Sequence, residues 1–129
     1  DGGARGNPGQ AAYGFVIFDE DGKRRYEEGK KIGHQTNNYA EYMAVVSALK
    51  WVAILRKKPS TLSFFLDSTL VVNQMNGVFK IKNEALRSLY FTAKTLEKSL
   101  NLKTAYTSVS REKNTDADRM VNLALDGLV

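Results

Sequence analysis

Residues 61–70 read TLSFFLDSTL, a nearly unbroken apolar run that ends on an acid. The run Leu62–Leu66 is typical of a strand that is buried on both faces in the centre of a sheet. Pro59 breaks the chain before this run, and a short helix is expected to follow Ser68. A buried strand followed by a helix indicates an α/β fold. Asp67 would then stand at the carboxyl end of the strand, where sites in such folds tend to lie.

The segment before this run contains a predicted hairpin. Residues 12–18 and 23–32 have the pattern of strands, and Asp21-Gly22 between them is a strong turn signal. Ahead of the hairpin, residues 1–9 (DGGARGNPG) are rich in glycine and are expected to form a loop. Their spacing matches neither the dinucleotide fingerprint nor the P-loop. Such a loop would let the backbone approach a sugar-phosphate chain closely.

Helices are predicted where apolar residues recur every three to four positions behind a capping residue. The longest begins at Thr36 or Asn37 and runs to about Arg56. The other expected elements are a short helix ending near Gly77, a helix over 83–100, a strand over 103–109 and a helix over 115–125. Hairpin strands first and helix-linked strands later predict an α/β fold with a mixed central sheet of about five strands flanked by helices.

The chain has 129 residues and suits a single domain. The hairpin and the Leu62–Leu66 strand have no obvious central neighbour in this scheme. We therefore expect the first strand to be missing from the 1–129 domain, and the natural polypeptide to carry an apolar strand ahead of Asp1.

The composition excludes several classes of protein. Apolar residues make up 43% of the chain and charged residues 26%, as in ordinary globular proteins, and no apolar run approaches a membrane span. Without cysteine there is neither a disulfide nor a thiolate metal site. We expect a cytoplasmic monomer with no membrane contact and no protein partner. The 19 basic against 14 acidic residues, a net charge of +5, favour nucleic acid as a partner, although solubility explains such a charge equally well.

Two acids stand where the patterns predict burial. At 100° per residue, Glu41 lies on the side of its helix that carries Val45 and Val52 and faces the sheet. The alternative is a hydrated first-turn glutamate favoured by the helix dipole. Asp67 ends the apolar strand, and its alternative role is to cap the next helix.

The last helix offers two candidate acids. Asp118 shares a face with Val121 and Leu125, whereas Asp116 points about 160° away from it, toward solvent. Asp118 is therefore expected to face the core. A capping-box contact with Thr115 is a second possible role, and the two roles do not exclude each other.

Asp1 completes the acidic set where a strand would leave the sheet. Acids from separate elements repel one another when they meet, and a divalent cation removes that repulsion. Oxygen donors, no cysteine and a single histidine, His34, indicate Mg²⁺ or Mn²⁺ rather than zinc.

Four segments, in order along the whole chain, closely resemble type 1 ribonucleases H of the compact prokaryotic kind. They are Asp1-Gly2-Gly3 with Gly6-Asn7-Pro8-Gly9, Thr36-Asn37-Asn38-Tyr39-Ala40-Glu41, Leu66-Asp67-Ser68, and Arg111 with Asn114-Thr115-Asp116-Ala117-Asp118-Arg119. The resemblance implies a ribonuclease H-like fold. It also implies an endonuclease that hydrolyses the RNA strand of RNA–DNA hybrids and leaves 5′-phosphate and 3′-hydroxyl ends.

By this resemblance, the catalytic and metal-binding residues are Asp1, Glu41, Asp67 and Asp118. They would act with two Mg²⁺ ions, for which Mn²⁺ is a possible substitute. Asp1 would bridge the ions and Asp118 would complete the ion that activates water. Glu41 and Asp67 would hold the ion on the leaving-oxygen side.

The resemblance also implies a surface for the hybrid. Asn7, Asn37 and Asn38 match positions that contact the minor groove, where the 2′-hydroxyl distinguishes RNA from DNA. Thr36 would lie near a phosphate of the DNA strand. Lys80 and Lys82 are expected to contact phosphates, with a plain solvated loop as the alternative. The full expected nucleic-acid-binding set is Gly3, Arg5, Asn7, Gly9, Thr36, Asn37, Asn38, Lys80 and Lys82.

The chain departs from the family pattern in two places. Many members carry a mobile histidine ten residues before the last catalytic aspartate, thought to assist product release. Here that residue is Ser108, so we expect slower turnover unless Arg111 or Glu112 substitutes. The stretch between Gly77 and Asn83 is too short for the long basic protrusion of some members, which predicts weaker binding.

Three other functions fit parts of the pattern. A catalytically weak or inactive hybrid-binding domain of the same fold is opposed by the presence of all four acids. A transposase or integrase core shares the acidic cluster but lacks the expected hybrid-reading asparagines. A small basic structural protein leaves the acids on buried faces unexplained.

Overall fold

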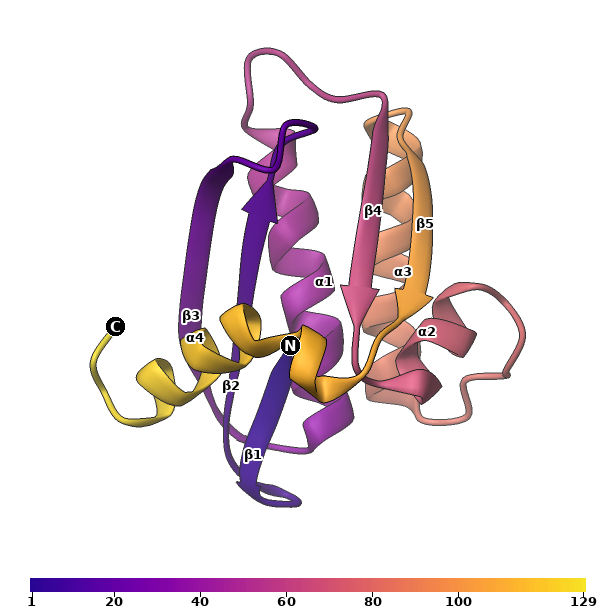
Figure 1. The fold of residues 1–129 in the computed structure, drawn as a ribbon. Coiled ribbons are helices and arrows are strands. Elements are labelled where there is room, and N and C mark those ends of the chain that lie inside the picture. The colour runs from indigo at the N-terminus through magenta and orange to yellow at the C-terminus, as the bar shows by residue number, and fades with distance from the viewer.

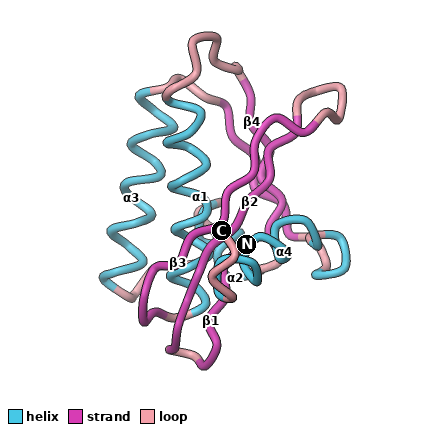
Figure 2. Tube along the Cα trace, turned by 90° about the vertical axis from the view of Figure 1, so that its left-hand side faces the viewer, coloured by secondary structure: helices cyan, strands magenta, loops and turns pink.

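The computed structural model describes residues 1–129 and has five strands and four α-helices (Figure 1). α1 and α3 lie on one side of the strands and α4 lies on the other (Figures 1 and 2). This arrangement confirms the predicted α/β class with flanking helices. The elements in chain order are β1 (Gly2–Gly6), β2 (Gly9–Phe18), β3 (Arg24–Gln35), α1 (Asn37–Ala53), β4 (Thr61–Leu66), α2 (Thr69–Met75), α3 (Glu84–Ser99), β5 (Lys103–Ser108), a 3-10 turn (Arg111–Lys113) and α4 (Thr115–Leu125).

The strands pair in two groups. β1, β2 and β3 form an antiparallel sheet in that order, and β4 pairs with β5 in parallel. The predicted hairpin is the β2–β3 pair, and Gly22 in its turn has a φ of +78° that favours glycine. The expected strand ahead of Asp1 stays a prediction.

The expected loop over residues 1–9 is wrong, because Gly2–Gly6 is a strand paired with β2. Gly2 allows close packing, whereas Gly6, with a φ of +92°, leads into the turn between β1 and β2. A Cβ at Gly2 would collide with the backbone of Ala40 and Glu41. Only a residue without a side chain lets β1 lie this close to the start of α1.

The expectation that Leu62–Leu66 is buried on both faces is also wrong. Leu66 is buried, and Leu62 and Phe64 pack against the core, whereas Phe65 is 58% exposed. The side chains alternate along the strand, and α1 and α3 cover only one of its faces. α4, on the other side, packs on β2 and β3 instead.

α1 begins behind a predicted cap, and α2 and α3 begin where helices were expected. The side chains of Thr36, Ser68 and Asn83 each accept a hydrogen bond from an amide in the first turn of α1, α2 and α3. α1 ends at Ala53, three residues before the predicted end. Gly77 follows α2 with a φ of +76°, as expected for a residue just past a helix end.

α1 forms the centre of the core. Tyr42, Val46 and Leu49 belong to a cluster that includes residues of α2, α3 and β4, whereas Ala44 and Ala48 pack against β2. α1 therefore joins the two groups of strands. No helix combines the length and apolar character needed to cross a bilayer.

Candidate active site

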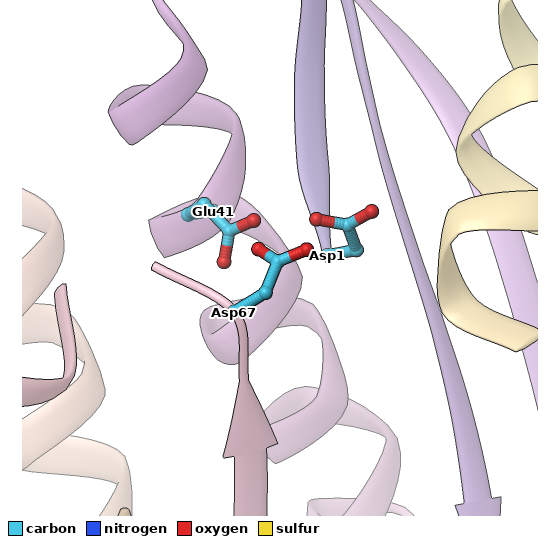
Figure 3. A group of neighbouring side chains, drawn as sticks. All are labelled: Asp1, Glu41 and Asp67. Atoms are coloured by element: carbon cyan, nitrogen blue, oxygen red, sulfur yellow. The ribbon is translucent and has the colours of Figure 1, made fainter. Parts of the chain in front are cut away.

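Three carboxylates converge where both groups of strands meet α1. Asp1 precedes β1, Glu41 lies in the first turns of α1 and Asp67 follows β4 (Figure 3). One oxygen from each lies within 4.8 Å of the others. Asp1 is 8% exposed and Glu41 only 3%. The predicted burial of Glu41 and the position of Asp67 at the strand end are confirmed.

Few hydrogen bonds compensate for this burial. The amide of Gly2 donates both to Oδ1 of Asp1 at 2.9 Å and to Oε1 of Glu41 at 2.8 Å. Oε2 of Glu41 and Oδ2 of Asp67 are buried and have no hydrogen-bond partner. Unsatisfied buried carboxylate oxygens are costly, so their presence together points to a missing partner.

The electrostatics of the cluster suit a cation. Burial raises the pKa of the Asp67 carboxyl above its usual range, and the neighbouring Glu41 carboxylate raises it further. The nearest cationic side chain is that of Arg111, whose Nε lies 4.0 Å from Oδ2 of Asp67 and whose side chain is 84% exposed. Oxygen donors converging from three elements match the ligand preference of Mg²⁺ and Mn²⁺, so the residues fit a divalent ion.

Asp118 lies on the wall of the same cavity, which has a volume of about 470 Å³, but outside the cluster of three carboxylates. Its Oδ2 accepts a hydrogen bond from Nδ2 of Asn122 at 3.3 Å. Asp116 is exposed and forms an ion pair with Arg24 at 3.3 Å. Asp118 and Asp116 therefore point in different directions, as the helical spacing predicted. The alternative capping box is not formed, because Asn114 precedes α4 without a side-chain cap.

Several residues of the expected nucleic-acid-binding set lie beside the acids. Gly3, Arg5, Asn37 and Asn38 line the cavity. β1 and the turn after it are both tied to the start of α1. Asn37 Oδ1 accepts from the amide of Ala4, in β1, at 2.7 Å, and Oδ1 of Asn7, in the turn, accepts from the amide of Asn37 at 3.0 Å. The β1–β2 turn and the start of α1 therefore form one surface.

The other members of that set are placed differently. Thr36 caps α1 and Gly9 begins β2, both next to this surface, whereas Lys80 and Lys82 lie outside the cavity, in the segment between α2 and α3. Asn122 also lines the cavity and was not anticipated. Its position four residues after Asp118, on the same helical face, was the available signal.

Known proteins similar to this chain match it over nearly its full length. A family model described as "Reverse transcriptase-like" matches residues 1–124. The bifunctional protein Rv2228c of Mycobacterium tuberculosis is 40% identical over 127 residues, which are 98% of this chain and 34% of that protein. Ribonuclease HI of Halobacterium salinarum is 38% identical over 126 residues, which are 98% of this chain and 62% of that enzyme. The chain thus spans about a third of the mycobacterial relative and under two thirds of the archaeal one.

Two solved structures are similar throughout. LC11-RNase H1 in complex with an RNA/DNA hybrid superimposes with a TM-score of 0.94 at 37% identity, over 98% of this chain and 94% of that chain. The N-terminal RNase H domain of Rv2228c, fused to maltose-binding protein, has a TM-score of 0.90 at 39% identity, over 99% of this chain and 91% of that chain.

Proposed function

Because the chain belongs to the type 1 ribonuclease H family, we propose that it is an endonuclease that hydrolyses the RNA strand of RNA–DNA hybrids. One observation carries the proposal: three carboxylates, two of them on buried residues, converge beside a surface of asparagines, and two of their oxygens have no hydrogen-bond partner. The relative bound to an RNA/DNA hybrid supports the substrate. The expected products carry 5′-phosphate and 3′-hydroxyl ends.

Asp1, Glu41, Asp67 and Asp118 would hold two Mg²⁺ ions, with Mn²⁺ as a possible substitute. When bound, the ions would activate water and stabilise the attacking and leaving oxygens of an in-line displacement. The chain itself supplies the fixed donors. The Gly2 amide holds the Asp1 and Glu41 carboxylates in place, and little of either residue is exposed to solvent. Asp118, on the wall of the same cavity, would complete the site.

The asparagines would read the hybrid. Asn37 and Asn38 line the cavity, and Asn7 is fixed to the start of α1, so these three side chains can meet the minor groove next to the acids. The 2′-hydroxyl is the feature there that identifies the RNA strand. Thr36, Gly9, Gly3 and Arg5 would contact the backbone beside them. Lys80 and Lys82 would contact phosphates farther along.

Arg111 is our candidate for the role that a histidine has in many members. Its guanidinium lies beside Asp67 on a side chain that is 84% exposed and therefore free to reach a phosphate. Ser108, at the histidine's position, is exposed at the end of β5. We assign Arg111 a contact with the 5′-phosphate of the cleaved RNA, which must dissociate before the next turnover.

The proposal is tested with labelled RNA–DNA hybrid, RNA duplex and DNA duplex, each with and without Mg²⁺. We expect cleavage only of the RNA in the hybrid, only with the metal, and with 5′-phosphate ends. Asp67→Asn is the matched control and should bind the hybrid without cutting it. Tight binding without cleavage by the wild type would instead favour the inactive hybrid-binding domain. Cleavage of plain DNA duplex would favour the transposase-like alternative.

A further inference from the structure

The segment between α2 and α3 has no regular structure, yet its backbone is held in place. We call residues 78–82 the basic loop, because Lys80 and Lys82 are its exposed charged side chains. Its first two amides, of Val78 and Phe79, both donate to the carbonyl of Asn73, at 2.8 and 3.3 Å. Two helix side chains hold the carbonyls farther along the loop.

The first of these side chains is Gln74, in α2. It is 6% exposed, and its Oε1 accepts the hydroxyl of Tyr42 at 2.7 Å while its Nε2 donates to the carbonyl of Lys80 at 3.5 Å. Tyr42 is fully buried in α1 and directly follows Glu41 in the chain. The buried amide therefore links the basic loop to the helix that carries an active-site acid.

The second side chain is Arg87, in the first turns of α3. Its Nε and Nη2 donate to the carbonyl of Ile81 at 3.2 and 3.1 Å. Gln74 and Arg87 thus hold two consecutive carbonyls, those of Lys80 and Ile81. Both contacts are made to the backbone, so the ammonium groups of Lys80 and Lys82 stay free for a ligand.

We propose that Gln74 and Arg87 are positioning residues for nucleic-acid binding, which fix the basic loop in its binding geometry before the hybrid arrives. This inference rests on the proposed function. When only a fraction of molecules has the competent loop, the apparent dissociation constant rises by the inverse of that fraction.

Two conservative variants test the inference. Gln74→Met removes the amide and keeps the size of the side chain, and Arg87→Lys keeps the charge but loses the planar fork. Binding of a fluorescent RNA–DNA hybrid is measured in EDTA over a range of salt concentrations. We expect each variant to bind roughly three- to tenfold more weakly, the worth of about one neutral hydrogen bond. The slope of log K against log salt should be unchanged, because the bound state keeps its phosphate contacts.

Direct contact residues should give a different signature. Lys80→Ala should weaken binding and also reduce the slope of log K against log salt by about one.

In Gln74→Met and Arg87→Lys, the amides of residues 80–82 should exchange hydrogen faster. The cleavage rate of these two variants at saturating hybrid should equal that of the wild type. A purely structural role would lower the melting temperature and leave affinity unchanged. Arg56→Lys, the same exchange at an exposed arginine with no hydrogen bond, is the control.

The outcomes separate the inference from the proposed function. Unchanged affinity in Gln74→Met and Arg87→Lys, with weakened binding in Lys80→Ala, overturns the positioning role and leaves the proposed function standing. Unchanged affinity in both Lys80→Ala and Lys82→Ala overturns the inference by removing the loop from the binding surface. Hybrid cleavage by the same proteins then shows whether the nuclease activity itself holds. If Gln74→Met does not fold, the exposed Arg87→Lys decides alone.

Discussion

Asp116 and Asp118 stand two residues apart in one helix and face different surroundings. Asp118 lies on the cavity wall, whereas Asp116 pairs with Arg24 outside it. We predict that Asp118→Asn lowers the rate of hybrid cleavage about 100-fold or more, at the upper end of losses for groups that support a metal site. Asp116→Asn should retain most activity. Both are measured as single-turnover rates in Mg²⁺, with circular dichroism as the folding control. Equal losses in two folded variants would contradict the assignment.

Asp67 should weaken the metal-free fold. Burial and Glu41 raise its pKa above the value in the unfolded chain. A raised carboxyl pKa contributes stability that is present below the unfolded pKa and lost as the pH rises through the folded pKa. At neutral pH the buried charge is therefore unfavourable, and the asparagine of Asp67→Asn carries no charge.

We accordingly predict that Asp67→Asn melts at a higher temperature than the wild type in EDTA at pH 7. The gain should be on the order of 1 kcal/mol, roughly 4 °C for a domain of this size. The difference should shrink as the solution is acidified. Asp21→Asn, in the exposed hairpin turn, is the control and should leave the midpoint unchanged. A lower midpoint for Asp67→Asn would argue against carboxylate crowding.

A substitution at Ser108 tests whether the histidine found there in many family members speeds product release. If that histidine speeds product release, Ser108→His should raise steady-state turnover more than the single-turnover rate. Arg111→Ala should do the opposite and slow steady-state turnover more than the chemical step. No change in either variant would mean that product release does not limit turnover.

At the scale of elements, α4 packs closely on the sheet because glycines there leave room for its backbone. A Cβ at Gly14 in β2 would lie 2.7 Å from the carbonyl oxygen of Ala117, Cβ of Met120 and the amide nitrogen of Val121. Two of these atoms belong to the helix backbone and cannot turn aside. α4 itself would have to shift, and Asp118 would move with it.

We predict that Gly14→Ala lowers the free energy of unfolding by about 1–3 kcal/mol, as overpacking does, and also lowers the cleavage rate. Thermal melting and single-turnover assays measure the two effects. Gly3→Ala is the thermal control, since its Cβ would meet only Val121 Cγ1 at an ordinary 3.5 Å. Normal melting of Gly14→Ala would mean that α4 packs more loosely than the structure indicates.

At the scale of the whole molecule, the acids come from both groups of strands. Asp1 leads into the antiparallel sheet, Asp67 ends β4 of the parallel pair and Glu41 lies on α1 between them. A cation bound to all three would join the two halves. An ion that binds only the folded state stabilises it by mass action.

We therefore predict that Mg²⁺ raises the melting temperature of the wild type. At 100 times its dissociation constant the gain is about 2.7 kcal/mol, or roughly 10 °C. Asp67→Asn should show a much smaller rise, whereas Asp21→Asn should show the full effect. An equal rise in all three proteins would indicate that Mg²⁺ binds elsewhere.

The sequence by itself determined the features that depend on neighbours in the chain. The cap at Thr36, the starts of α2 and α3 after Ser68 and Asn83, the hairpin turn and the order of helices follow from local hydrogen bonding and from the periods of helix and strand. The same periods predicted that Glu41 is buried and that Asp118 and Asp116 diverge. The family resemblance came from short motifs of this local kind.

Only the tertiary structure decided the rest, because packing partners distant in the chain are not encoded in a local pattern. Gly2–Gly6 is a strand because the backbone of α1 lies against it, and Phe65 is exposed because no helix covers that face of β4. The distances within the acidic cluster, its two unpartnered oxygens and the position of Asp118 outside it depend on how three separate elements meet. The contacts that hold the basic loop likewise join residues 42, 74 and 80, which only the folded chain brings together.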